Sequence, residues 1–207
     1  MGISDHVVVL DAGRRLAQGT PAQVQAAPAV QQAYLGESLD AGPAGEGRAD
    51  RRETGPEMLG VGGVVAGYGA EPVLHGIDLR VRRGEAVALL GANGAGKSTL
   101  MRTLSGLHRP LAGGGIHLDG EELMHAGPEQ IVARGMVLVP EGRQVFPELS
   151  VLDNIRLGAF LKPEGREERV EAMLLRFPRL RERLHQRAGL LSGGEKARVH
   201  MARVLAQ

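Results

Sequence analysis

Short apolar runs alternate along this chain with segments whose apolar residues recur at helical spacing. The apolar runs and one hairpin turn predict β-strands at residues 7–10, 15–18, 59–66, 73–81, 86–90, 116–118 and 136–139. Helical spacing, or a proline at the first position, predicts helices at residues 98–107, 128–134, 151–158, 166–177 and 195–206. Pro21, Pro28 and Pro178 each begin a shorter predicted helix, the first with Thr20 as its N-cap. This mixture of strands and helices predicts an α/β fold.

Residues 38–57 break the pattern. They are small or charged, rich in Gly and Pro, and have no periodic apolar positions. Such a composition cannot bury enough apolar surface to offset the entropy lost on ordering, so it predicts a flexible linker. We therefore expect a hairpin–helix segment at residues 1–37, the linker at 38–57 and a larger domain at 58–207. The first segment is too small to bury much surface by itself and must pack against something else.

One glycine-rich stretch lies between a predicted strand and a predicted helix. It reads Gly91, Ala92, Asn93, Gly94, Ala95, Gly96, Lys97, Ser98, Thr99 and fits the phosphate-loop pattern of Gly, four residues, Gly-Lys-Ser. In that context the loop amides and the positive end of the helix would bind a phosphate. Lys97 would reach the β- and γ-phosphates, and the Ser98 hydroxyl would ligate Mg²⁺.

A second candidate site precedes the last predicted helix and reads Leu191, Ser192, Gly193, Gly194, Glu195. Small residues and a hydroxyl at a helix N-terminus also make an anion site. Taken alone, the same residues are read more simply as an N-cap with a glycine-rich approach. Their place downstream of a phosphate loop makes the functional interpretation more specific.

Composition narrows the possible functions. The chain has no cysteine, which excludes disulfides and thiol-based metal or redox sites, and its seven histidines show no metal-ligand spacing. The formal net charge of +1 gives no electrostatic reason to expect nucleic acid as a partner. No apolar stretch approaches the ~20 residues of a membrane-spanning helix, and the N-terminus lacks the pattern of a signal peptide. We expect a cytoplasmic protein.

The two motifs together resemble the nucleotide-binding subunits of ABC transporters, and the resemblance runs from residue 59 to residue 207. It implies a P-loop NTPase of the ABC type, with an antiparallel β subdomain, a helical signature subdomain, and ATP and Mg²⁺ as ligands. It implies that residues 91–99 are the Walker A loop and that Tyr68 stacks on adenine. Glu141 stands at the Q-loop position, where most of the family has Gln, and would be a Mg²⁺ ligand beside Ser98. Residues 192–195 would be the signature, which acts on the ATP of a partner subunit.

A closer resemblance concerns the transported substrate. The sequence Pro-Glu-Gly-Arg at residues 140–143, followed by Val-Phe-Pro at 145–147, resembles the second ATP-binding subunit of branched-chain amino-acid importers. Residues 1–37 resemble the C-terminal tail of the sister ATP-binding subunit. The resemblance implies a sister ATP-binding subunit and membrane permease subunits as partners, and a location at the inner face of the cell membrane.

The family pattern also includes residues that this sequence does not show after Ser192. These are a strand ending in Asp, a Glu that acts as general base, and a switch histidine. We therefore expect a C-terminally incomplete fold whose sheet lacks central strands, with the hairpin of residues 7–18 as one candidate to cover part of the gap. The expected function is the ATP-binding component of an importer. The alternative is a truncated, catalytically inactive nucleotide-binding module or regulatory fragment, and the motif at 191–195 argues against a different P-loop enzyme such as a kinase.

Overall fold

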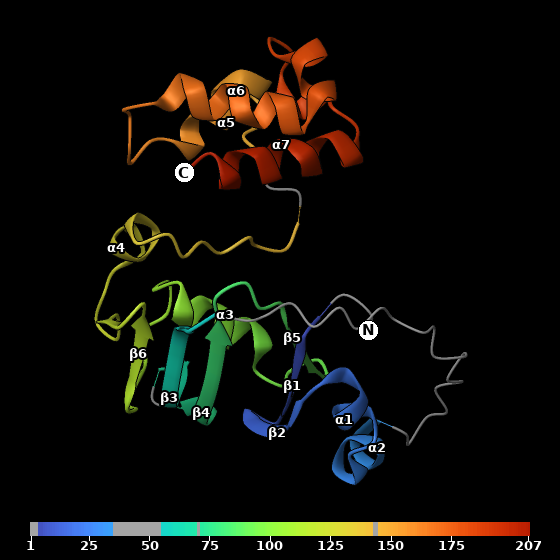
Figure 1. Ribbon diagram of the computed structural model, residues 1–207, viewed down its shortest axis with the longest axis vertical. Coiled ribbons are helices and arrows are strands. Elements are labelled where there is room, and N and C mark those ends of the chain that lie inside the picture. The colour runs from blue at the N-terminus through green and yellow to red at the C-terminus, as the bar shows by residue number, and fades with distance from the viewer. Residues whose placement is uncertain (1–3, 35–54, 70, 143–144) are drawn as a thin grey trace. The chain divides into compact units, whose positions relative to one another are not determined.

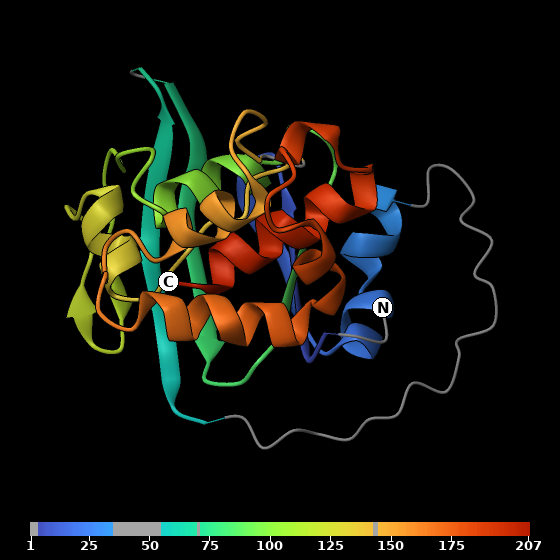
Figure 2. The same cartoon turned by 90° about the horizontal axis from the view of Figure 1, so that it is seen from above.

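A computed structural model describes residues 4–34, 55–69, 71–142 and 145–207, which fall into two compact units, Met1–Arg134 and Gly135–Gln207. Figures 1 and 2 show the elements of each unit. Most of the predicted linker, together with residues 1–3 and 35–37 of the predicted tail and Arg143, lies outside the described residues. No helix in the described ranges is both long enough and apolar enough to cross a bilayer.

The chain begins with a hairpin and two short helices, as predicted. Strand β1 (His6–Asp11) pairs antiparallel with β2 (Arg14–Gly19), and α1 (Pro21–Gln25) and α2 (Pro28–Tyr34) follow. Thr20 caps α1 through a capping box: its hydroxyl accepts the N–H of Gln23 at 3.3 Å, and the Gln23 side chain accepts the N–H of Thr20 at 2.9 Å.

The hairpin joins a sheet with the strand that leads into the phosphate loop. Strand β5 (Val87–Gly91) pairs in parallel with β1, from His6 opposite Val87 to Leu10 opposite Gly91. The strand order is β2-β1-β5, so β1 is central, and its residues Val7, Val8, Val9 and Leu10 are at most 1% exposed. An uninterrupted apolar run suits a strand that is covered on both faces. The first unit thus contains both the predicted tail and the phosphate loop.

A second, antiparallel sheet completes the first unit, in the order β4-β3-β6-β7. Its strands are β3 (Glu57–Tyr68), β4 (Glu71–Arg82), β6 (Gly115–Leu118) and β7 (Glu121–Glu122), and the unit's remaining helices are α3 (Lys97–Leu104) and α4 (Pro128–Ala133). The predicted antiparallel β subdomain is therefore present. Figure 2 shows β3 and β4 as a long pair, with α3 beside them.

The second unit is helical. It contains α5 (Val151–Gly158), α6 (Arg166–Arg176), the 3₁₀ turns η1 (Pro178–Arg183) and η2 (Ala188–Leu190), and α7 (Gly193–Leu205). Its core takes apolar residues at helical spacing from all three α-helices, including Val151, Ile155, Val170, Leu174, Val199 and Ala202. The predicted bounds of α5 match the structure, and those of α6 and α7 differ by two residues or fewer at each end.

One predicted element is wrong. Residues 136–139 form no strand, and Val139 is 45% exposed. A strand is stable only when its backbone groups pair with a neighbour, and no described strand pairs with these residues. An apolar run predicts burial but does not supply that neighbour.

The buried Asn154 gives a stability prediction for the second unit. Its side chain is fully buried, accepts the N–H of Phe146 at 2.8 Å and donates to the carbonyl oxygens of Phe146 at 3.0 Å and Ser150 at 2.9 Å. Asn154→Ala would remove these three side-chain hydrogen bonds from a fully buried position, so the free energy of unfolding should fall by about 2 kcal/mol. Urea denaturation followed by circular dichroism measures the change. The exposed substitution Glu168→Ala is the control, and an equal effect from both variants would contradict the role given to Asn154.

Candidate phosphate-binding and signature sites

The phosphate loop turns sharply between β5 and α3. Gly94 and Gly96 have φ values of +84° and +98°, a left-handed conformation that favours glycine. A side-chain carbon on Gly96 would also lie 2.7 Å from a methyl group of Leu74. The loop therefore needs glycine at both positions for its shape, independently of any ligand.

The N-terminus of α3 is suited to an anion. Its N-cap is Gly96, no side chain in the described part of the chain caps it, and its first turn contains no acidic residue. The first amides of the helix are thus left to a ligand or to water. Lys97 bends back over the loop, and its ammonium donates to the carbonyl oxygens of Gly91 and Ala92, both at 2.8 Å. This cation and these amides fit a phosphate group.

The other predicted loop residues gather at the same place. Asn93, Gly94 and Ser98 are exposed, while Ala95 and Thr99 are buried and anchor the loop. Thr103, one turn further along α3, donates its hydroxyl to the carbonyl oxygen of Thr99 at 2.8 Å. The exposed hydroxyl of Ser98, in the first turn of α3, is suited to bind Mg²⁺ because a hydroxyl oxygen is a hard donor.

Tyr68 ends strand β3 and is tied to the helix that begins at the phosphate loop. Its ring is 53% exposed, with its centroid 4.9 Å from that of His108. Arg102 on α3 donates to the Tyr68 hydroxyl oxygen at 3.2 Å. Hydrogen bonding from Thr99, and then from Arg102, holds the pKa of Tyr68 below its ordinary value. An exposed aromatic ring thus lies in the same unit as the loop, whereas its contacts with Arg102 and His108 were not predicted.

The signature residues form a complete helix cap. Ser192 is the N-cap of α7, its hydroxyl accepts the N–H of Glu195 at 3.4 Å, and the Glu195 carboxylate accepts the N–H of Ser192 at 2.9 Å. Arg183 adds an ion pair to Glu195 at 2.8 Å. These interactions hold the pKa of Glu195 below its ordinary value, and the hydrogen bond from the Ser192 backbone N–H has the largest effect. The structure thus bears out the capping interpretation, and the role of Gly193 and Gly194 toward a partner's nucleotide remains a prediction.

The predicted Mg²⁺ ligands belong to different units. Ser98 lies in the first unit, and Glu141 lies in the second, where it is exposed. Their shared metal site therefore remains a prediction. Within the described ranges, no three His, Cys, Asp or Glu side chains gather as a metal site would require.

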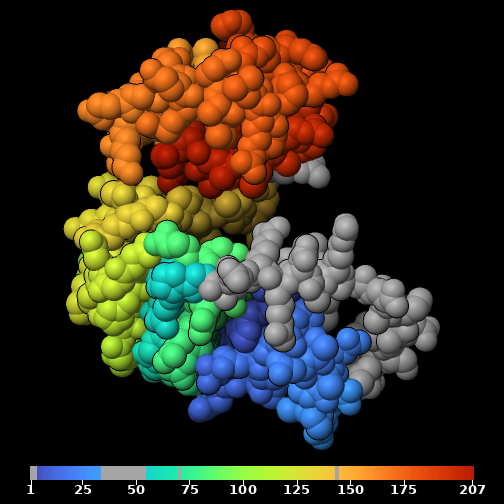
Figure 3. Space-filling view, viewed as in Figure 1, coloured from blue at the N-terminus to red at the C-terminus, as the bar shows by residue number. Residues whose placement is uncertain are grey.

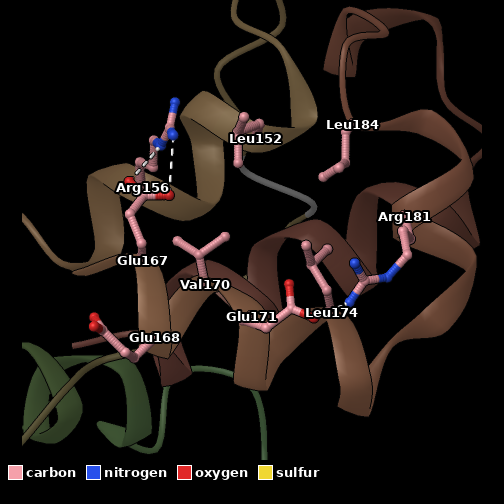
Figure 4. A pocket seen from close by; sticks show the side chains of 9 residues that line it. All are labelled: Leu152, Arg156, Glu167, Glu168, Val170, Glu171, Leu174, Arg181 and Leu184. Carbon is pink, nitrogen blue, oxygen red and sulfur yellow. Dashed lines mark hydrogen bonds and ion pairs between the residues drawn. The ribbon is translucent and has the colours of Figure 1, made fainter. Parts of the chain in front are cut away.

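A hollow of about 510 Å³ lies within the helical unit (Figure 4). Its apolar wall consists of Leu152, Val170, Leu174 and Leu184. Two ion pairs flank it: Arg156 with Glu167, at 3.0 Å, and Arg181 with Glu171. Hydrogen bonds from Arg156 hold the pKa of Glu167 below its ordinary value. Since these charges are satisfied within the unit, we assign the hollow no part in nucleotide binding.

The hydroxyl of Tyr68 gives a titration prediction. Arg102→Ala removes a positive charge and a hydrogen-bond donor from the phenolic oxygen, so the pKa of Tyr68 should rise. The chain contains two tyrosines and no tryptophan, so ultraviolet titration in a Tyr34→Phe background follows Tyr68 alone. Arg109→Ala is the matched control, and an unchanged tyrosine pKa in Arg102→Ala would show that the contact does not form in solution.

Comparisons with known proteins agree with this geometry. Residues 74–207 match the family model described as "ABC transporter", and residues 14–40 match one described as "Branched-chain amino acid ATP-binding cassette transporter". The chain is 42% identical over 149 residues to the high-affinity branched-chain amino acid transport ATP-binding protein BraG of Pseudomonas aeruginosa, covering 72% of this chain and 64% of that protein. It is 39% identical over 158 residues to the lipoprotein-releasing system ATP-binding protein LolD of Hyphomonas neptunium, covering 72% and 68%.

The chain spans only part of the length of several relatives. One example is the alpha-glucoside transport ATP-binding protein AglK of Rhizobium meliloti, to which the chain is 36% identical. The match covers 67% of this chain and 38% of that protein. Among solved structures it resembles "Structure of ATP binding subunit of ABC transporter", with a TM-score of 0.62, 34% identity, and coverage of 72% of this chain and 62% of that one. The phosphate loop, the capped helix at Ser192 and these matches together place the chain in the ABC transporter ATP-binding family.

Proposed function

We propose that this chain is an ATP-binding component of an ABC importer for branched-chain amino acids. Nucleotide binding is supported by the geometry of the loop: Lys97 and the N-terminus of α3, which no described side chain caps, face the same turn. That arrangement binds the phosphates of a nucleotide electrostatically, and Ser98 would hold Mg²⁺ beside them. When bound, Mg²⁺ neutralises charge on the phosphates.

Two comparisons support branched-chain amino acids as the substrate. Relatives include branched-chain amino acid transport ATP-binding proteins of Pseudomonas aeruginosa and Archaeoglobus fulgidus. The match of residues 14–40 to a branched-chain amino acid family model is a second, separate sign. Other relatives are named for glucosides, glycerol 3-phosphate and lipoproteins, so ATP binding itself is the broader inference.

We further propose the assembly in which the chain acts. Residues 1–37 would correspond to the tail of a sister ATP-binding subunit, 38–57 to a linker and 58–207 to the nucleotide-binding domain. Ser192, Gly193, Gly194 and Glu195 would close on the ATP of a sister subunit, whose signature in turn would complete the site at Lys97. Permease subunits would hold the assembly at the inner face of the membrane.

A second candidate function is nucleotide binding without hydrolysis. The geometry at Lys97 accounts for the binding of phosphates, which both candidates share, whereas hydrolysis also needs a general base. Glu195 itself is engaged by Ser192 and Arg183. Phosphate release by the purified chain separates the two candidates: release that depends on Lys97 supports the first, and binding without release supports the second.

Lys97→Ala tests the proposed site. It removes the cation that faces the phosphates, so the affinity for MgATP should fall by at least about tenfold, the loss expected for a charge-assisted hydrogen bond. Isothermal titration calorimetry measures the dissociation constant. Lys162→Ala is the control with the same change of charge, and thermal unfolding checks that both variants are folded. Unchanged affinity in Lys97→Ala would show that the nucleotide binds elsewhere or not at all.

A further inference from the structure

We infer that the hairpin of β1 and β2 is part of the nucleotide site: it holds the phosphate loop in its binding shape, with Gly13 as the positioning residue. The inference rests on the proposed function, since it takes the loop as the nucleotide site. It assigns to the N-terminal hairpin a role in nucleotide binding, although the loop itself starts only at Gly91.

The first connection is the ladder between β1 and β5. It ends with Leu10 opposite Gly91, the first residue of the loop. At its other end Asp5 makes two bonds with Ala86: the Asp5 N–H donates to the Ala86 carbonyl oxygen at 2.8 Å, and the Asp5 carboxylate accepts the Ala86 N–H at 2.8 Å. The strand that carries the loop is thus fixed along its whole length by the hairpin.

The second connection is made by the turn of the hairpin. The Gly13 N–H donates to the carbonyl oxygen of Ala95, inside the loop, at 3.1 Å. The Gly13 carbonyl oxygen accepts the N–H of His75, on β4, at 2.9 Å. A single residue of the hairpin therefore links the phosphate loop to the antiparallel sheet.

The hairpin packs so closely against its neighbours that larger residues would not fit at the contact positions. Gly13 has φ +71°, and a side-chain carbon there would lie 1.7 Å from the carbonyl oxygen of Val73. A side-chain carbon on Gly91 would lie 2.6 Å from the Leu10 carbonyl oxygen, and one on Gly96 would lie 3.6 Å from Gly13 Cα. Both glycines that frame the loop thus lie against the backbone of the hairpin. Figure 3 shows the N-terminal residues, in blue, packed against the residues of the antiparallel sheet.

The hairpin has a reason to stay in place. Val7 and Val9 pack against Ala88 and Leu90 of β5 as well as against residues of the N-terminal segment, so undocking would expose part of this buried apolar surface to water. Undocking would also leave β5 without its paired strand β1 and would break the hydrogen bond between the Gly13 N–H and the Ala95 carbonyl oxygen. A chain binds nucleotide in proportion to the fraction in which the hairpin is docked, and by linkage a bound nucleotide must stabilise the docked hairpin.

The first test compares two glycine substitutions. Gly13→Ala forces the turn away from Val73, whereas Gly84→Ala introduces the same residue at φ +78° with no atom within 4 Å. We expect Gly13→Ala to raise the dissociation constant for MgATP by at least about tenfold and Gly84→Ala to leave it within about twofold of the unaltered chain. Circular dichroism identifies any variant that fails to fold.

The unaltered chain provides a second test that needs no variant. Hydrogen exchange of residues 6–11 is measured without nucleotide and with MgATP at 100 times its dissociation constant. Exchange through undocking should slow by up to about 100-fold, because the ligand binds the docked state alone. In Lys97→Ala, whose affinity is expected to be at least about tenfold lower, the same nucleotide concentration should slow exchange at least about tenfold less than in the unaltered chain, and this variant serves as the control.

The outcomes separate this inference from the function on which it rests. If the unaltered chain does not bind MgATP, the proposed function is wrong. If it binds MgATP through Lys97, but Gly13→Ala binds equally well or exchange at residues 6–11 is unaffected by nucleotide, the inference alone is overturned. Weaker MgATP binding by Gly13→Ala, together with exchange at residues 6–11 that nucleotide slows in the unaltered chain, supports the inference.

Discussion

The parallel pairing of β1 with β5 is the interaction that places the phosphate loop within the first unit. It joins a segment at the start of the chain to the strand that carries the phosphate loop, and it makes β1 the central strand of its sheet. The four consecutive apolar residues of β1 are buried because the strand is covered on both faces. The hairpin and residues 55–134 thus belong to one structural unit, although the chain matches one family model at residues 14–40 and another at residues 74–207.

The two candidate anion sites are both at helix N-termini, but only the N-terminus of α7 is capped by a described side chain. At α3 the N-cap is Gly96, without a capping side chain among the described residues, and Lys97 supplies a cation. At α7, Ser192 and Glu195 cap the helix mutually, and Arg183 balances the carboxylate. The first arrangement leaves amides for a phosphate within this chain. In the second, the cap groups are paired within this chain, and an action on a ligand held by another subunit remains a prediction.

The features that short-range sequence patterns determine were predicted correctly. The loop at residues 91–99, the cap at Ser192 and the helix at 151–158 were visible because spacing and residue type determine them. The strand predicted at 136–139 failed because pairing requires a neighbour that an apolar run does not specify. The register of β1 on β5, and the contacts of Tyr68 with Arg102 and His108, join segments far apart in the sequence. Such contacts follow from packing, and a single sequence carries no direct signal for them.

We expect residues of this chain alone to build a phosphate site for a nucleotide. Calorimetric titration of the unaltered chain with MgATP tests it most directly, because the titration gives both affinity and stoichiometry. We expect saturable binding of one nucleotide per chain, weakened by competing inorganic pyrophosphate because the loop recognises phosphates. Titration without saturable heat, at a chain concentration where circular dichroism shows both helix and strand, would contradict it.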